Sequence, residues 1–353
     1  MGRTVGIKVV AAAAGVSTTT VSHALNGKGR ISEETRNHVR EVAARLGYQP
    51  SAMARGLAGG RTGMLAMVVS GLDDFSLQVG DFDYFLQLMN GATSSALKRG
   101  FSLTMLQADG DMKILDGLPL DGAIVIDPVP GDRIVKRLTA RGVAVVTTGR
   151  MLDGRGDACW VDNDHVAGTR AVLDHLADAG ARRVALLSSP PVSSYAFDAR
   201  SAYLAWCDER EQEPVVAELS GSMSEGSAYA AATDLLASDT PPDGIYATLD
   251  RLALGALLAA EARGVAVPGD LRIAGCTDSE ASRQARPALT ALSLDPDRLG
   301  REALELLLEL VEDGEPQVRQ RLIAATVVAR ASTAADAQGK RTRAGPGMRR
   351  RAP

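Results

Sequence analysis

The sequence predicts two kinds of structure in one chain: an all-α head at the N-terminus and a doubly wound parallel α/β body behind it. Residues 7–46 contain three short helical patterns and no strand-like run. From residue 63 to about residue 332, apolar runs of strand length alternate with helical stretches. Such alternation predicts parallel sheets covered by helices. The body is longer than one ordinary domain, so we expect two sheet units.

The head begins with two helices joined by a sharp turn at Gly15. Glycine tolerates positive φ at little cost, and Ser17 follows as the expected N-cap of the second helix. Apolar residues share one face of that helix: Val21, Ala24 and Leu25. Short polar residues share the opposite face: Thr19, Ser22, His23 and Asn26. Hydroxyl, imidazole and amide groups reach base edges and phosphates without bulk, so this face is a candidate DNA-binding surface.

A third helix follows a glycine-rich loop. Ser32 is its expected N-cap, and two carboxylates, Glu33 and Glu34, lie against the positive end of its dipole. Its inner face is apolar at helical spacing: Val39, Val42, Ala43 and Leu46. The first helix is expected to pack on the second through three residues: Val10, Ala13 and Ala14. Three short helices with this turn predict a helix-turn-helix module.

Charge is distributed unevenly along the chain. Residues 1–62 contain nine Lys or Arg and three Glu, and residues 333–353 contain six Lys or Arg and one Asp. The whole chain nevertheless has a net charge of −4, so the body is strongly acidic. A basic head on an acidic body is typical of a nucleic-acid-binding protein.

The motifs of the head are specific enough to name a family. Residues 14–27, Ala-Gly-Val-Ser-Thr-Thr-Thr-Val-Ser-His-Ala-Leu-Asn-Gly, resemble the lactose-repressor (LacI/GalR) family of bacterial transcription regulators. Residues 31–36, 46–50 and 52–57 resemble the same family, in the same order and spacing. A weaker resemblance continues to about residue 332. The resemblance implies a repressor that binds a palindromic operator as a homodimer under control of a small-molecule effector, a sugar or related metabolite.

The resemblance also implies roles for residues of the head and the segment behind it. The second helix would lie in the major groove, with three residues at base edges: Thr18, Thr19 and His23. Three further residues would hold phosphates: Ser17, Ser22 and Asn26. Residues 50–59 resemble a hinge that folds into a helix on operator DNA, with Ala54 and Leu57 at the minor groove. A leucine from each of two protomers would wedge into the central base step and kink it.

Four departures from the family pattern bear on these expectations. Val9 stands where the family usually has Asp, and Gly6 where it usually has a Thr cap, so the first helix should be capped less well. His23 stands where Arg is common and offers fewer bonds to guanine. Gly56 weakens the hinge helix by roughly 1 kcal/mol relative to Ala.

The resemblance implies that the body consists of two subdomains of periplasmic-binding-protein type, with chain crossings near Asp162, Leu292 and Ile323. Ligands in such folds bind at the carboxyl ends of strands, between the halves. Arg200 and Asp278 match positions of family effector contacts, whereas Leu249 replaces the usual Asn and removes one polar contact. Four more residues are weaker candidates: Asp250, which could simply cap a helix, and the aromatic Trp160, Phe75 and Tyr195, which could equally belong to the core.

Other functional classes fit the sequence less well. The four histidines have no metal spacing, and neither a phosphate loop nor a nucleophile elbow is present, so we expect neither an enzyme nor a cofactor or metal. A solute-binding protein without a regulatory role is the main alternative, but it would not explain the basic head. Three widely separated cysteines, the lack of an export signal and the lack of an apolar span predict a cytoplasmic, nucleoid-associated protein without membrane contact.

These observations divide the chain into four parts. Residues 1–47 form the predicted helix-turn-helix domain, 48–62 the hinge and 63–332 the effector-binding and dimerisation domain. Residues 333–353 are rich in Ala, Gly and Arg and are expected to be a disordered basic tail. The tail has no leucine heptads, so the tetramer of some family members is not expected.

Overall fold

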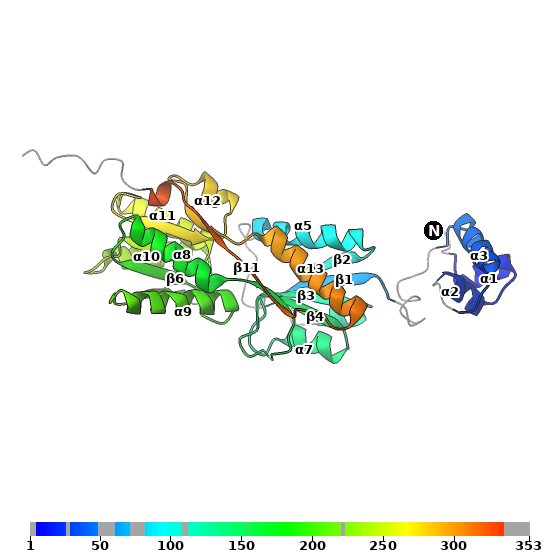
Figure 1. The fold of residues 1–353 in the computed structure, drawn as a ribbon. Helices are drawn as coiled ribbons and strands as arrows, with labels where there is room; N and C mark the ends of the chain where they lie inside the picture. Colours follow the sequence, from blue (N-terminus) through cyan, green and yellow to red (C-terminus); the bar gives the residue numbers. More distant parts are fainter. Residues whose placement is uncertain are drawn as a thin grey trace, which may run out of the picture.

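The computed structural model describes residues 5–25, 29–48, 61–70, 82–107, 112–154, 156–219 and 223–334. It contains a three-helix head and two α/β lobes that lie end to end (Figure 1). The first lobe contains the sheet that begins at β1, and the second contains the sheet that begins at β6. The predicted fold class, an α-helical head followed by two parallel-sheet subdomains, is confirmed.

The head consists of α1 (Ile7–Ala14), α2 (Thr18–Leu25) and α3 (Glu33–Arg45). Gly15 ends α1 in the left-handed region at φ 67°, as the turn requires. Gly6 is the N-cap of α1 and offers no side-chain cap, whereas the Ser32 hydroxyl accepts a hydrogen bond from the Thr35 amide. The eight buried residues of the head core are Val10, Ala11, Ala14, Val21, Ala24, Val39, Val42 and Ala43. The expected contact through Ala13 is wrong: Ala13 is exposed, and Ala11 faces the core because it lies one turn before Ala14.

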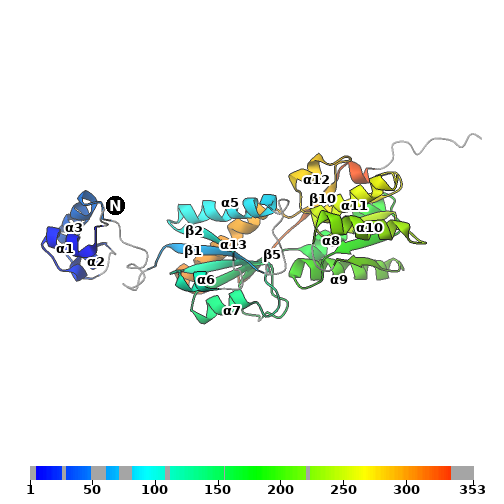
Figure 2. The same cartoon turned by 180° about the vertical axis from the view of Figure 1, so that it is seen from behind.

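The first lobe is built on a six-stranded sheet in the order β11-β5-β4-β3-β1-β2, with all strands parallel. Its strands are β1 (Met64–Val69), β2 (Ser102–Gln107), β3 (Gly122–Ile126), β4 (Ala144–Thr148), β5 (Trp160–Asn163) and β11 (Gln320–Ile323). Its helices are α5 (Phe82–Lys98), α6 (Lys113–Gly117), α7 (Arg133–Ala140) and α13 (Pro296–Asp313). Alternate residues of β1 pack on α5 and α13 or, on the other face, on α6 and α7 (Figure 2).

The second lobe repeats this plan with the strand order β12-β10-β9-β8-β6-β7, in which only β12 is antiparallel to its neighbour. Its strands are β6 (Val184–Ser188), β7 (Val215–Glu218), β8 (Gly244–Ala247), β9 (Arg272–Cys276), β10 (Thr290–Ser293) and β12 (Thr326–Val328). Helices α8 (His165–Asp178) and α9 (Ser194–Glu209) pack on one face, and α10 (Glu225–Ala237) and α11 (Asp250–Ala262) on the other. Two short elements, α12 (Glu280–Gln284) and the 3-10 turn Ala331–Thr333, complete the lobe.

The chain passes between the lobes three times: between β5 and α8, between β10 and α13, and between β11 and β12. The second passage places α13, late in the sequence, beside α5 in the first lobe (Figure 1). Two glycines allow the backbones of these helices to meet. A Cβ on Gly300 would lie 2.0 Å from the Leu88 carbonyl oxygen, and one on Gly91 would lie 1.9 Å from that of Asp297. This close packing fixes the N-terminal ends of both helices at the cleft between the lobes.

Candidate DNA-binding face and effector cleft

The exposed face of α2 is formed by short polar side chains. Ser17 is the N-cap of α2: its hydroxyl accepts a hydrogen bond from the Thr20 amide at 3.0 Å. Thr18, Thr19 and His23 are exposed, whereas Val21 on the opposite face is completely buried. An α2 packed on its apolar side therefore presents hydroxyls and an imidazole to the outside.

The turn before α3 lies directly against the His23 ring. Gly29 has φ 76°, and a Cβ at this position would lie 2.6 Å from the Nδ1 of His23. Only glycine satisfies both the left-handed backbone and this close approach. Gly29 thus restricts where the imidazole of His23 can lie on the surface.

A cavity of about 370 Å³ lies between the two lobes. The carboxyl ends of both sheets line it, because the strands of each lobe run toward the other lobe. From the first lobe come Asp127 after β3, Thr148 at the end of β4 and Asp162 in β5. From the second come Thr248 after β8 and Thr277 after β9. This is where ligands bind in open parallel α/β sheets.

Unusual backbone conformations concentrate at this cavity. Four non-glycine residues in the described ranges have positive φ, and three of them line the cavity: Asp127 at 49°, Thr277 at 68° and Asp295 at 48°. Such conformations cost on the order of 1–3 kcal/mol each and persist where the surrounding structure requires them. Their clustering at one cavity indicates a functional site.

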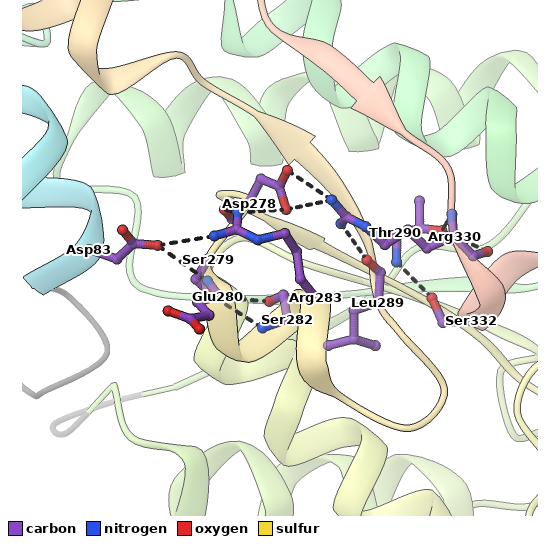
Figure 3. Close-up of polar contacts among 10 residues, drawn as sticks. All are labelled: Asp83, Asp278, Ser279, Glu280, Ser282, Arg283, Leu289, Thr290, Arg330 and Ser332. Carbon is purple, nitrogen blue, oxygen red and sulfur yellow. Dashed lines mark hydrogen bonds and ion pairs between the residues drawn. The ribbon is translucent and has the colours of Figure 1, made fainter.

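Asp278 is held by two arginines of the second lobe (Figure 3). The Nη2 of Arg330 donates to both carboxylate oxygens at 2.7 and 2.8 Å, and the guanidinium of Arg283 donates to the Asp278 carbonyl. Arg330 is fixed in turn, because its Nη1 donates to the Leu289 carbonyl and its amide donates to the Thr290 hydroxyl, each at 2.8 Å. The Asp278 carboxylate is therefore committed to arginines of its own lobe.

Among the polar contacts that join the lobes in the described part of the chain, two pair an aspartate of one lobe with an arginine of the other. At one of them, Asp83 of α5 accepts a hydrogen bond from the Glu280 amide at 3.2 Å and lies 3.8 Å from the Nη2 of Arg283 (Figure 3). At the other, the guanidinium of Arg150 donates to both carboxylate oxygens of Asp198, with 2.5 Å between Nη1 and Oδ2. Hydrogen bonding to Asp198 raises the pKa of Arg150.

A buried acid–imidazole pair lies beside the second link. The Oδ1 of Asp162 is 3.7 Å from the Nε2 of His165, and its Oδ2 accepts a hydrogen bond from the Arg150 amide. Burial raises the pKa of Asp162, although His165 and Arg150 oppose this shift. Burial lowers the pKa of His165, so its imidazole is neutral at pH 7. Among the described residues, no group of three or more His, Cys, Asp and Glu side chains could hold a metal ion.

Comparison with known proteins identifies this architecture. The family model for bacterial regulatory proteins of the lacI family matches residues 6–51, and the model for periplasmic binding protein-like domains matches residues 173–333. The chain combines a lacI-family helix-turn-helix head with a periplasmic-binding-protein-like body. It is a DNA-binding transcriptional regulator, and the alternative of a solute-binding protein without a regulatory role is wrong.

Relatives of this regulator are similar to it over nearly their whole length. The transcriptional regulator CelR of Thermobifida fusca is 28% identical over 330 residues, which cover 91% of this chain and 95% of CelR. The transcriptional repressor PurR of Mannheimia succiniciproducens is 27% identical, covering 86% of this chain and 91% of PurR. These relatives are regulators rather than enzymes.

Solved structures give the same result. A CelR–cellobiose complex has a TM-score of 0.69 at 26% identity, with 93% of this chain and 99% of that chain covered. A lac repressor dimer bound to operator and the anti-inducer ONPF has a TM-score of 0.76 at 26% identity, with 94% and 99% covered. In the described part of our regulator, no helix has the length and apolar character needed to cross a membrane.

The structure of the regulator brings together only part of the predicted effector site. Asp250, Asp278 and Tyr195 line the cavity. Arg200 does not: it lies on the side of α9 that faces β7, where its guanidinium pairs with Glu218. Trp160 does not line it either, because it is the first residue of β5 and the cavity is at the opposite end of that strand.

The remaining predicted residues are divided between the head and undescribed segments. Ser22 is half-buried on α2, and its neighbours Ser17 and Thr18 are exposed. Four predicted contacts lie outside the described residues: Asn26, Ala54, Leu57 and Phe75. Sequence reasoning missed several residues that line the cavity: Tyr84, Asp127, Thr148, Asp162, His165, Thr248 and Arg251. Asp127 and Thr248 follow a strand directly, and Thr148 and Asp162 lie at the carboxyl ends of strands, which is the signal that could have identified these four.

Proposed function

We propose that this regulator binds a palindromic operator as a homodimer and that a small hydroxylated molecule in the cleft controls the binding. The observation that carries the proposal is the cavity formed by both lobes in a chain that also has a helix-turn-helix head. The similarity to a lac repressor dimer bound to operator, and to CelR bound to cellobiose, supports it. We expect the cavity to bind its ligand without converting it chemically. Operator binding would place the protein on the nucleoid.

In this proposal α2 lies in the major groove, with Thr18, Thr19 and His23 at base edges. Their exposure on the side of α2 opposite the head core supports this orientation. Ser17, Ser22 and Asn26 would hold phosphates. The Ser17 hydroxyl already caps α2, so a phosphate there would also meet the positive end of the helix dipole.

The segment behind the head would complete the DNA-binding unit in the dimer. Ala54 and Leu57 would lie at the minor groove, with one leucine from each protomer at the centre of the site. Unstacking a base step costs a few kcal/mol, so the wedge is favourable only if two hinges pack together and allow more protein to touch DNA. This requirement couples dimerisation to recognition of a two-fold symmetric operator.

The effector would act through the arrangement of the lobes. The two lobes are held together across the cleft by the pairs Asp83–Arg283 and Arg150–Asp198, and we call this arrangement the closed form. Effector binding between the two sheets would change the free energy of the closed form relative to one in which the lobes lie further apart. A change in the first lobes of a dimer would alter the spacing of the two hinges. Couplings of about 1–3 kcal/mol are typical and correspond to a 5- to 150-fold change in operator affinity.

Selection of duplexes from a random pool by the full chain tests the DNA-binding face. We expect His23→Ala to select a different half-site or to lose affinity, because the imidazole lies at the end of the exposed polar face. His38→Ala is the matched control: it removes an exposed imidazole from α3 and should leave selection unchanged. If His23→Ala selects the parent duplex with parent affinity, α2 does not read the operator as proposed.

Leu57→Ala tests the hinge in the same assay. We expect specific binding to be lost while non-specific binding at low salt is kept, because phosphate contacts supply most of the non-specific affinity. Parent affinity of Leu57→Ala for the selected duplex would contradict the minor-groove wedge.

A further inference from the structure

His23 lies on the exposed face of α2, in the last turn of the helix. The head core fixes the rotation of α2, because Val21 and Ala24 are completely buried in it. The His23 side chain is therefore directed to the outside. An exposed side chain normally changes between rotamers within nanoseconds, so a neighbouring group is needed to hold the imidazole in one of them.

The turn before α3 supplies this neighbouring group. A Cβ on Gly29 would lie 2.6 Å from the Nδ1 of His23, 3.1 Å from its Cγ and 3.3 Å from its Cε1. These three atoms form one side of the imidazole ring, and Nε2 belongs to the other side. The Gly29 backbone therefore covers the Nδ1 side of the ring, and Nε2 is the nitrogen that lies farther from the turn.

Gly29 is held in place from the α3 side of the turn. Its carbonyl oxygen accepts a hydrogen bond from the Ile31 amide at 3.2 Å, and Ile31 packs against the head core. Ser32 follows as the N-cap of α3 and accepts a hydrogen bond from the Thr35 amide at 3.2 Å. The turn is thus anchored independently of His23, and its backbone is a fixed surface against which the imidazole packs.

We infer that Gly29 is a positioning residue for operator recognition, which holds the His23 imidazole so that Nε2 makes the hydrogen bond to a base edge. The inference rests on the proposed function of α2 as the helix in the major groove. One ring nitrogen makes a single hydrogen bond, and such a bond weakens steeply as its distance and angle depart from the optimum. A side chain at residue 29 would displace the ring from the turn and move Nε2 away from the base that it contacts.

Duplex binding by the full chain tests this positioning role. The duplex that the parent selects from a random pool is compared with duplexes in which one base pair of each half-site is changed, and the ratio of the two affinities measures discrimination at that base pair. We expect Gly29→Ala to lower this ratio by about fivefold or more at the base pair where His23→Ala also lowers it. Discrimination at the other base pairs should be unchanged.

Gly47→Ala is the matched control for backbone strain. Gly47 belongs to the same head and has φ 66°, but a Cβ there would have no atom within 4 Å beyond those of the adjacent residues. The variant therefore introduces the same left-handed strain without a contact to His23, and discrimination should be kept. Gly29→Asn is a second test variant, because asparagine tolerates the left-handed region better than alanine and also brings a Cβ against the ring. Circular dichroism melting shows whether each variant is folded.

Combination with variants of His23 separates positioning from a purely structural role. Without the imidazole there is no ring to displace, so Gly29→Ala should cause no further loss of discrimination in the His23→Ala background. A structural role of the turn would instead lower the affinity for every duplex, with or without the imidazole. His23→Gln and His23→Asn identify the nitrogen. Glutamine places its amide nitrogen near the position of Nε2 and asparagine near that of Nδ1, so glutamine should keep more of the parent discrimination.

Three results would overturn the inference: parent discrimination in both Gly29 variants, an equal loss with and without the imidazole, or better discrimination by His23→Asn than by His23→Gln. Gly29 variants that are unfolded or bind no duplex, while Gly47→Ala is folded and binds, would overturn it as well, because Gly29 would then be required for the head itself. Parent selection and affinity in His23→Ala would contradict the proposed function of α2. Altered selection by His23→Ala, with parent selection by the Gly29 variants, would contradict only the role of Gly29.

Discussion

The ion pair between Arg150 and Asp198 joins the two lobes, and we predict that Arg150→Met weakens the closed form of the cleft. The guanidinium makes two hydrogen bonds to the Asp198 carboxylate and lies 3.7 Å from that of Asp162. Methionine keeps an extended apolar side chain but removes the charge and every donor. Asp198, whose side chain is only 7% exposed, would lose its cross-lobe partner.

The solvent exposure of the Arg150 and Asp198 side chains sets the expected coupling free energy between them. Removing one partner of a fully buried ion pair costs about 3–5 kcal/mol, whereas exposed pairs contribute about 0–1 kcal/mol. The Arg150 side chain is 30% exposed and that of Asp198 is nearly buried, so we expect a coupling of about 1–3 kcal/mol. Because the pair spans the cleft, losing its coupling free energy destabilises the closed form. Ligand affinity should therefore fall roughly 5- to 150-fold.

A double-mutant cycle measures this coupling. Arg150→Met, Asp198→Asn and the double variant are compared by urea unfolding, and small-angle scattering reports the radius of gyration, which should rise in the single variants. Arg170 and Glu209 provide the control cycle, since they pair within the second lobe with side chains 41% and 48% exposed. If the cross-lobe cycle gives no more coupling than this surface cycle, the pair does not hold the cleft closed.

Three further predictions follow from single positions. Gly300→Ala should destabilise the chain by about 1–3 kcal/mol or more in urea unfolding, because its Cβ would meet helix backbone. Gly226→Ala should be neutral or slightly stabilising, because its Cβ would make only an ordinary contact, 3.9 Å from the Ser224 hydroxyl oxygen. Arg200→Ala should leave calorimetric binding of the cleft ligand unchanged, since Arg200 pairs with Glu218 outside the cavity; lost binding would contradict this placement. His165→Gln should flatten the stability–pH curve below about pH 6.5.

The sign of the His165 effect follows from its environment. Burial lowers the pKa of this imidazole in the folded state, so the unfolded chain binds more protons as the pH falls through the ordinary histidine pKa. Stability of the parent is therefore lost on acidification in that range, and the loss continues down to the lowered folded pKa. A glutamine cannot take up this proton. An identical pH dependence of parent and variant would show that His165 is not buried in a neutral form.

The head could be predicted from the sequence because its determinants are local. The glycine turn, the serine caps and the apolar spacing of α2 and α3 lie within a few residues of the contacts they make. The longer central strands were predictable for a similar reason: β1 and β3 are continuous apolar runs buried on both faces. The short strands β5, β7 and β10 to β12 are harder to recognise in the sequence, because they have three or four residues and several carry polar side chains.

The cleft was harder to predict because it joins residues far apart in the chain. Asp127 and Asp250 line one cavity although they come from different lobes, and only the facing sheet edges bring them together. Arg200 was expected to contact the effector because of its position in a motif. It lies on the side of α9 that faces β7, however, and it pairs there with Glu218. Asp278 lines the cavity, yet its carboxylate is held by Arg330, some fifty residues later, which no local pattern indicates.

The most direct test of the account is the operator affinity of the full chain with and without ligand in the cleft. Calorimetric titration with a panel of small sugars, cellobiose among them, first identifies one that binds in the cleft. Fluorescence anisotropy with the selected duplex, measured with and without that sugar, gives this difference. We predict that the bound sugar shifts operator affinity by roughly 5- to 150-fold. An unchanged operator affinity with that sugar bound in the cleft would contradict control of DNA binding by this cavity.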